Sequence, residues 1–145
     1  MKTNKDEYKW VPLERVGKFF LDTPCANYDI EKVITPLDDP VTGSGIYETD
    51  IQGIYLFEEN GIIGSIECDK QFFFKNFNFI GMNIKQAISI LGSEPSTIDK
   101  LILYADSPND DKLNIIYYFD NFGLELWCVD DKVDSAIAEG KCEDE

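Results

Sequence analysis

The chain has 145 residues, of which 43% are hydrophobic and 13% aromatic, so it is long enough to fill one hydrophobic core. Aspartate and glutamate number 28 against 13 lysines and arginines, and the formal charge of -15 excludes direct binding to nucleic acid, because phosphate binding requires the opposite sign. A field of this sign attracts basic partners instead.

The absence of histidine from the sequence excludes several kinds of active site. Histidine is the commonest general base and a common zinc ligand, so Ser-His-Asp and Cys-His sites cannot be built. The cysteines stand too far apart for a CxxC metal or redox motif, and we expect reduced thiols at Cys25, Cys68, Cys128 and Cys142. We therefore expect no enzymatic activity, no metal and no other cofactor.

The amino terminus, MKTNKDEYKW, is charged and lacks the apolar segment of a signal peptide. No segment of the sequence reaches the roughly 18 apolar residues of a membrane span. We therefore expect a cytoplasmic protein without a membrane partner, folded as a single domain over residues 1–145.

Three segments show the apolar spacing of a helix. The first is 12–21, where the apolar residues follow a proline that suits a first helical turn. The second is 29–37, which Pro36 should end early or kink. The third is 84–91, where Asn83 is the expected N-cap and a glycine supplies the stop. The sequence thus predicts three helices in its first two thirds.

Two nine-residue segments repeat one pattern at a spacing of 62: IYLFEENGI at 54–62 and IYYFDNFGL at 116–124. Each has an alternating apolar run, one or two acids, a glycine and another apolar run, which is typical of an antiparallel hairpin. We predict a duplicated helix, strand and hairpin unit, with halves at about 22–70 and 77–138. The fold class is α+β, an antiparallel sheet of about six or seven strands with helices over one face.

The remaining segments complete this prediction. Short strands are expected from Gly45 and from Leu101, ahead of the two hairpins. Between the two units, the phenylalanines of QFFFKNFNF predict one further strand, because they alternate and are too apolar to leave both faces in water. In the tail from Val133, one helical turn is expected through Ala136 and Ile137.

Acidic residues gather at the two hairpins and in the polar insertion ADSPNDDKL, and tyrosines flank them. If the strands that carry them are neighbours, these groups line one end of the sheet. Tyrosine beside carboxylate makes tight contacts with lysine and arginine of another protein. The predicted partner-binding residues are therefore Glu58, Glu59, Tyr104, Asp106, Asp110, Asp111, Tyr118 and Asp120.

Other sites are less favoured by the sequence. The alternative partner-binding surface is the aromatic strand, where Phe72 and Phe74 would receive a hairpin of the partner or extend a sheet by strand addition. The acidic segments lack the alternating acids and the turn glycine of a calcium loop. Nothing marks two acids as a catalytic pair in a cleft, so a carboxylate-based hydrolase is the least favoured hypothesis.

The segment NFIGMNIKQAISILGSEP, in a small acidic chain without histidine, resembles the immunity proteins of bacterial contact-dependent growth inhibition and related polymorphic toxin systems. It is also similar to the helix that opens the repeated units of β-lactamase inhibitor proteins and of small outer-membrane assembly lipoproteins. The LPxxY-type signature of one large immunity family is not matched. The immunity resemblance implies a cytoplasmic protein that binds one cognate toxin domain 1:1, most often a basic nuclease, and covers its active or substrate-binding surface. The alternative is an acidic adaptor or nucleic-acid mimic that inhibits another basic protein.

Overall fold

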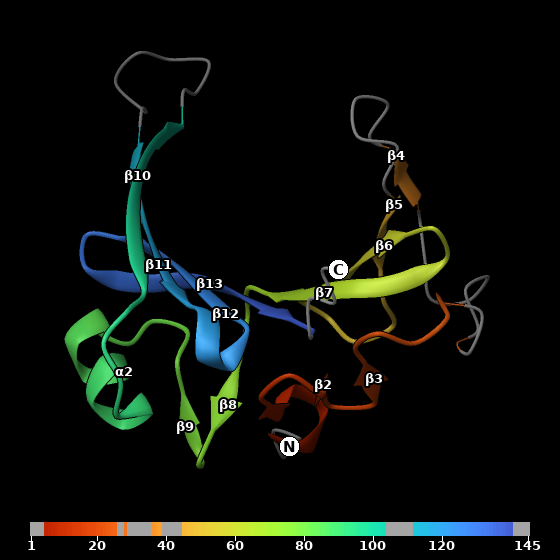
Figure 1. Cartoon of the computed structure of the whole chain (residues 1–145), viewed down its shortest axis with the longest axis horizontal. Helices are drawn as coiled ribbons and strands as arrows, with labels where there is room; N and C mark the ends of the chain where they lie inside the picture. The colour runs from red at the N-terminus through yellow and green to blue at the C-terminus, as the bar shows by residue number, and fades with distance from the viewer. Residues whose placement is uncertain (1–4, 26–27, 29–35, 39–44, 104–111, 141–145) are drawn as a thin grey trace.

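The computed structural model describes residues 5–25, 28, 36–38, 45–103 and 112–140 (Figure 1). The main sheet consists of the strands β4 (Pro36–Asp38), β5 (Gly45–Glu48), β6 (Ile54–Glu59), β7 (Ile62–Cys68), β10 (Thr97–Leu103), β11 (Lys112–Phe119), β12 (Leu124–Val129) and β13 (Lys132–Glu139). They form an eight-stranded antiparallel sheet in the order β10-β11-β12-β13-β7-β6-β5-β4. The α+β class with a large antiparallel sheet is confirmed, and the sheet is wider than expected.

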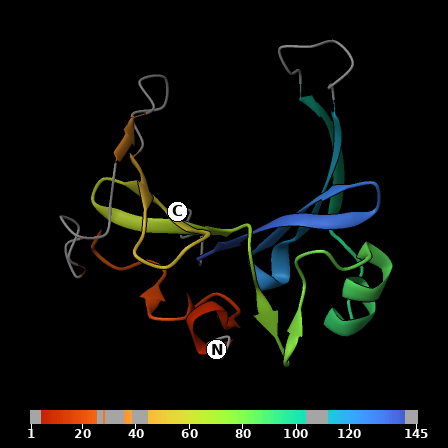
Figure 2. The same ribbon diagram turned by 180° about the vertical axis from the view of Figure 1, so that it is seen from behind.

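The smaller elements lie on one side of this sheet. They are η1 (Lys5–Tyr8), a three-stranded sheet of β1 (Trp10–Val11), β2 (Arg15–Val16) and β3 (Phe19–Phe20), the hairpin of β8 (Phe73–Phe74) and β9 (Phe77–Asn78), α2 (Ile84–Leu91) and the turn η4 (Asp120–Phe122). In Figure 1 the β8–β9 hairpin lies below the centre of the sheet, α2 below the end that carries β10, and β2 and β3 below the other half. Strands β10 and β4, at the two ends of the sheet, rise on the other side, and Figure 2 shows the same arrangement from behind. The sheet is therefore curved, and the smaller elements lie on the side away from which its two ends bend.

The helix α2 begins and ends as its sequence predicts. The side chain of Asn83 accepts a hydrogen bond from the amide of Lys85 at 2.9 Å, which satisfies one free donor of the first turn. At the other end Gly92 takes a left-handed conformation with φ 74°, which a glycine adopts without strain. Ile84 and Leu91 are buried in the same hydrophobic core as residues of the strands.

The two halves of the sheet are related by a pseudo-two-fold axis. Residue n of β5 to β7 corresponds to residue n + 70 of β11 to β13, because the six pairs of the β6–β7 hairpin reappear at that spacing in the β12–β13 hairpin. A β-bulge falls between Phe57 and Glu58 in the first hairpin and between Trp127 and Cys128 in the second. Strands β7 and β13 pair at the centre of the sheet, where residues 67 and 137 lie opposite each other. Residues 67 and 137 are also equivalent to each other, because they differ by 70 positions, so the axis passes between them.

The duplication also includes the short hairpins in front of each half. In the first half the amide of Leu21 donates to the carbonyl of Glu14 at 2.8 Å and closes the β2–β3 hairpin. In the second half the amide of Phe79 donates to the carbonyl of Phe72, also at 2.8 Å, and closes the β8–β9 hairpin. The repeated unit is therefore larger than a helix, a strand and a hairpin.

The chain after each short hairpin bonds to the last strand of its own half. The amide of Ile63 in β7 donates to the carbonyl of Thr23 at 2.9 Å, and the amide of Val133 in β13 donates to the carbonyl of Met82, also at 2.9 Å. Ile63 and Val133 differ by the same 70 positions, so this contact belongs to the duplication as well.

The predicted hairpins at 54–62 and 116–124 are both confirmed as strand, turn, strand, but their equivalence is wrong. The first joins β6 to β7, whereas the second joins β11 to β12. The true partner of the first is the β12–β13 hairpin, whose turn contains no glycine but has Asp130 and Asp131 at positive φ. Any two hairpins share the apolar, acidic and turn pattern, so that pattern alone did not determine which hairpins are equivalent.

The helix predicted at 12–21 is wrong, because this segment forms β2 and β3. Leu13 and Gly17 both have positive φ, 64° and 56°, which ends any right-handed helix at each position. The buried side chains are those of Val16 and Phe19, both 0% exposed, rather than the stripe that the spacing indicated.

Three other sequence predictions also change. Residues 29–35 of the second predicted helix lie outside the described residues, and its end is wrong because Leu37 belongs to β4. The aromatic strand is instead the β8–β9 hairpin, which turns at Lys75 and Asn76 with φ 52° and 69°. The helical turn expected in the tail is strand β13, whose backbone pairs on both sides. Of the short strands, β5 begins at Gly45 as expected, and β10 begins four residues before Leu101.

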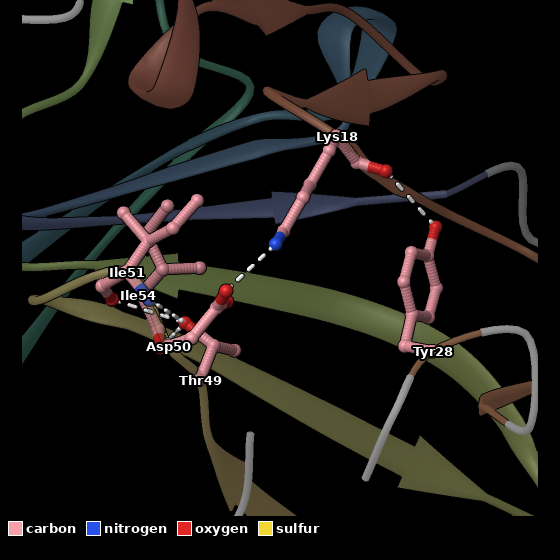
Figure 3. A network of polar contacts seen from close by, with 6 residues as sticks. All are labelled: Lys18, Tyr28, Thr49, Asp50, Ile51 and Ile54. Carbon is pink, nitrogen blue, oxygen red and sulfur yellow. Dashed lines mark hydrogen bonds and ion pairs between the residues drawn. The ribbon is translucent and has the colours of Figure 1, made fainter. Parts of the chain in front are cut away.

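Figure 3 shows how the β2–β3 hairpin is tied to the loop between β5 and β6. The Lys18 ammonium lies 2.8 Å from Oδ2 of Asp50, and the hydroxyl of Tyr28 donates to the carbonyl of Lys18 at 3.1 Å. Inside the loop the hydroxyl of Thr49 lies 2.9 Å from the carbonyl oxygen of Ile54. Both charged side chains are about half exposed, so this ion pair fixes the position of the loop more than it stabilises the fold.

Candidate functional site: the open face of the sheet

One face of the main sheet packs on the core and the other does not. The core residues of β6 and β12 are Ile54 and Leu56 in the first half and Leu124 and Leu126 in the second, all at most 1% exposed. Because side chains alternate along a strand, the residues between them point to the opposite face. We call this the open face; its central residues in the first half are Ile46, Glu48, Tyr55, Phe57 and Glu67, and in the second Ile116, Tyr118, Glu125, Trp127 and Ile137. Of these, Ile116 is only 4% exposed.

The open face repeats one arrangement on both sides of the pseudo-two-fold axis. In the first half Glu48 lies opposite Tyr55, and in the second half Tyr118 lies opposite Glu125. The positions are equivalent, although tyrosine and glutamate have exchanged strands. An aromatic residue follows two positions later, Phe57 or Trp127. Each half thus presents a tyrosine, a carboxylate and a second aromatic ring, and none of these ten positions carries lysine or arginine. The same alternation places one lysine, Lys132, on this face at the β12–β13 turn, opposite Val129.

The second-half cluster is centred on two glutamates. Glu139 follows the buried Ala138 in β13, so its side chain is on the open face, diagonal to Glu125. Burial, a hydrogen bond that protonated Glu139 donates to Glu125, and the charges of Glu125 and Asp120 raise the pKa of Glu139 to about 8. The indole nitrogen of Trp127 donates to Oε1 of Glu125 at 3.1 Å. The two carboxyl groups therefore form a coupled pair beside an aromatic ring.

Tyr118 joins this cluster from β11. Its pKa is raised by burial, then by the charges of Glu125 and Asp99, by a hydrogen bond to Asp99 and by the charge of Glu139. Its phenol is therefore neutral at physiological pH and acts as a hydrogen-bond donor.

The first-half cluster contains Tyr55, Glu48, Glu67 and Asp69. Asp69 raises the pKa of Tyr55 most, followed by burial, Glu48 and Glu67. The pKa of Glu67 is itself raised, mainly by burial and then by Asp69 and Asp134. Oδ1 of Asp69 is buried and has no hydrogen-bond partner in the part of the chain that the structure describes. This cluster therefore contains a carboxylate oxygen that accepts no hydrogen bond from the described residues.

The structure does not bring the predicted partner-binding acids together. Glu58 accepts hydrogen bonds from the Tyr47 hydroxyl at 2.7 Å and from the Gly61 amide at 2.6 Å, so it supports the β6–β7 turn. Glu59 is exposed beside it. Asp120 begins η4 after β11, and three strands separate β11 from β6 in the sheet. The condition that the acid-bearing strands are neighbours is therefore not met.

The other predicted residues have three different positions. Tyr118 lies on the open face, and Tyr104, Asp106, Asp110 and Asp111 lie outside the described residues. The alternative site is packed: Phe72 is 0% exposed, and the ring of Phe74 lies 5.0 Å from that of Trp10. Phe72 thus offers no surface to a partner.

Cys25, Cys68 and Cys128 are buried free thiols, and Cys142 lies outside the described residues.

Sequence reasoning missed Glu67, Asp69, Glu125 and Glu139. Glu67, Glu125 and Glu139 alternate with buried residues in β7, β12 and β13, and Asp69 follows β7 at the same spacing, so this alternation was the available signal. That signal places a residue on a face but does not indicate which strands pair. The cluster of Glu125 with Glu139 depends on the pairing of β12 with β13.

A groove of about 680 Å³ lies on the other side of the sheet, between α2 and β11. Ile84, Ile88 and Tyr117 supply its apolar wall, and Lys85 and Glu94 also line it. Its charges are mixed, so it does not match the basic partner that the net charge favours.

Neither a family model, nor a curated protein, nor a solved structure matches the chain. Within the described ranges, no three histidine, cysteine, aspartate or glutamate side chains are grouped so that they could hold a metal ion. None of the helices built from those residues has the length and apolar character needed to cross a membrane.

Proposed function

We propose that the protein is a cytoplasmic immunity protein that binds one cognate bacterial toxin and neutralises it without catalysis. The observation that carries this proposal is the open face, which combines aromatic and aliphatic side chains with carboxylates and no basic residue at its ten central positions. Aromatic side chains supply rigid contact area, and carboxylates orient a basic partner.

A nuclease is the class of toxin that suits this surface best. Its substrate-binding surface is basic because it receives phosphates. A sheet face with carboxylates on both sides of its centre imitates a row of phosphates, and the charge of -15 speeds the encounter. Such an inhibitor needs no reactive group, since covering the phosphate-binding surface is enough.

Co-expression tests the proposal directly. The chain should restore growth to cells that produce the toxin encoded beside its gene, and it should not protect against an unrelated basic nuclease toxin. The purified pair, with the toxin inactivated at its catalytic residue, should elute as a 1:1 complex when its mass is measured by light scattering. Absence of both protection and complex formation with the neighbouring toxin would refute an immunity function.

A further inference from the structure

We propose that the open face docks a basic protein through arginine side chains that enter its two equivalent clusters, one beside Tyr55 and one beside Tyr118. This inference rests on the function proposed above and specifies where, and by which chemistry, the toxin is held. It moves the docking site from the acidic loops, which the sequence favoured, to the centre of the sheet.

Charge complementarity identifies the occupant. Every charged neighbour that perturbs Tyr55, Glu67, Tyr118 or Glu139 is an acid, and every one of these perturbations raises a pKa. The protein therefore holds like charges close together on a partly desolvated surface, which costs free energy in the absence of a cation. A cationic side chain of the partner removes this cost.

The geometry of the second-half cluster favours a guanidinium. Two carboxyl groups hydrogen-bond to each other only while one of them holds a proton, as Glu125 and Glu139 do. A guanidinium presents several N–H donors in one plane, so it bonds both carboxylates at once and takes the place of that proton. Trp127 and Tyr118 offer aromatic surface beside it.

The first-half cluster supplies an observation that is independent of charge. Oδ1 of Asp69 is buried and unpaired within the described chain, next to Tyr55 and Glu67. Asp69 and Glu139 are equivalent under the spacing of 70, so both clusters have a carboxylate at this place. Asp69 as a whole is partly exposed, so a guanidinium of the partner pairs with its carboxylate at this place.

A peptide titration tests the docking chemistry without the toxin. The probe is a nine-residue peptide of alternating arginine and serine, titrated into the full chain at 150 mM salt and followed by amide chemical shifts. The largest shifts should fall in β7, β12 and β13. Largest shifts at the β6–β7 turn or along α2 would overturn the proposal.

Two double variants are compared at pH 9, where Glu139 is ionised, so that both lose the same charge and a specific site can be separated from general attraction. Glu125→Gln with Glu139→Gln should weaken binding of the peptide by about tenfold, because it removes both carboxylate charges. Glu14→Gln with Glu94→Gln, at exposed positions outside the open face, should weaken it by less than about threefold. Equal weakening by the two variants would show that the peptide is attracted only by net charge, and the proposal would fail.

The pH dependence gives a second measurement on the same site. The groups that face Glu139 are Glu125 from β12, Tyr118 from β11 and Asp120 from η4, with Ser65 opposite it in β7. Because the peptide displaces a proton that Glu139 holds up to a pKa of about 8, its affinity should rise by up to about fiftyfold between pH 6 and pH 8. Glu139→Gln should abolish this rise, and an unchanged rise would contradict the proposal.

The outcomes distinguish the inference from the function on which it rests. If the peptide binds the open face but the chain protects against no toxin, the immunity function is wrong and the docking chemistry stands. If the chain protects and the Glu125→Gln, Glu139→Gln variant protects with unchanged affinity, the function stands and the open face is not the docking surface.

Discussion

Replacing Glu139 by glutamine should make the protein more stable in alkaline solution. Glutamine has the shape of protonated glutamate, so it keeps the contact with Glu125 and removes a charge that burial and Glu125 disfavour. The folded protein holds the Glu139 proton up to a pKa of about 8, whereas a glutamate in the unfolded chain releases it near the ordinary value of 4.5. Between these values the folded state binds more protons, so the wild-type protein loses stability as the pH rises.

The expected gain in the free energy of unfolding follows from the difference between these two pKa values and from the solvent exposure of Glu139. Part of the Glu139 side chain remains in water, which screens its charge, and Glu125 shares the cost of ionisation. We therefore expect a gain of roughly 1 to 2 kcal/mol for Glu139→Gln above pH 8, and almost none near pH 4.5.

Urea unfolding followed by tryptophan fluorescence at pH 5, 7 and 9 measures this gain. The control is Glu94→Gln, which removes one negative charge from an exposed position after α2. A constant difference between Glu139→Gln and wild type from pH 5 to pH 9 would refute the reasoning. So would an equal gain in the control, because the stabilisation would then come from the lower net charge.

Three further predictions concern the duplicated sheet and its core. Leu56→Ala and Leu126→Ala remove equivalent side chains that are 0% exposed, so each should lower the free energy of unfolding in urea by about 2 to 5 kcal/mol. A loss below about 1 kcal/mol at either position would contradict their equivalence. Gly61→Ala should destabilise the protein by about 1 kcal/mol, because φ is 82° at this position. Gly64→Ala should be neutral or stabilising, because Gly64 is in a strand and a Cβ there meets open space. If both variants change the melting temperature alike, this explanation is wrong. Burial, with Asp131 and Asp134, raises the pKa of Cys128 to about 12, so its thiol should react with a disulfide reagent at pH 8 only after unfolding.

Sequence reasoning succeeded where a local pattern determines a local structure. Helix α2 was predicted with both ends because its apolar stripe, its N-cap Asn83 and its stop Gly92 all lie within ten residues. The hairpin at 54–62 was predicted from its apolar runs and glycine, and its turn lies at Asn60 and Gly61, which both take the positive φ that a two-residue hairpin needs.

Reasoning from local patterns failed at 12–21 and in the tail. Both segments have apolar residues at helical spacing, but short segments are decided by the surface against which they pack. Phe19 is buried among residues of the main core, and β13 is held by β12 on one side and β7 on the other. Although β12 directly precedes β13, β7 lies more than 60 residues earlier, and the core around Phe19 also comes from distant strands, so a local window lacks part of the deciding information.

The amino-acid sequence by itself determined that the chain is acidic, lacks histidine chemistry and repeats a β-rich unit. Only the tertiary structure decided the spacing of 70, because equivalence is defined by which strands pair. The same pairing assembled the candidate site. Glu125 and Glu139 belong to different strands, and their carboxyl groups meet because the β12–β13 register places them diagonally on the face that the core leaves open.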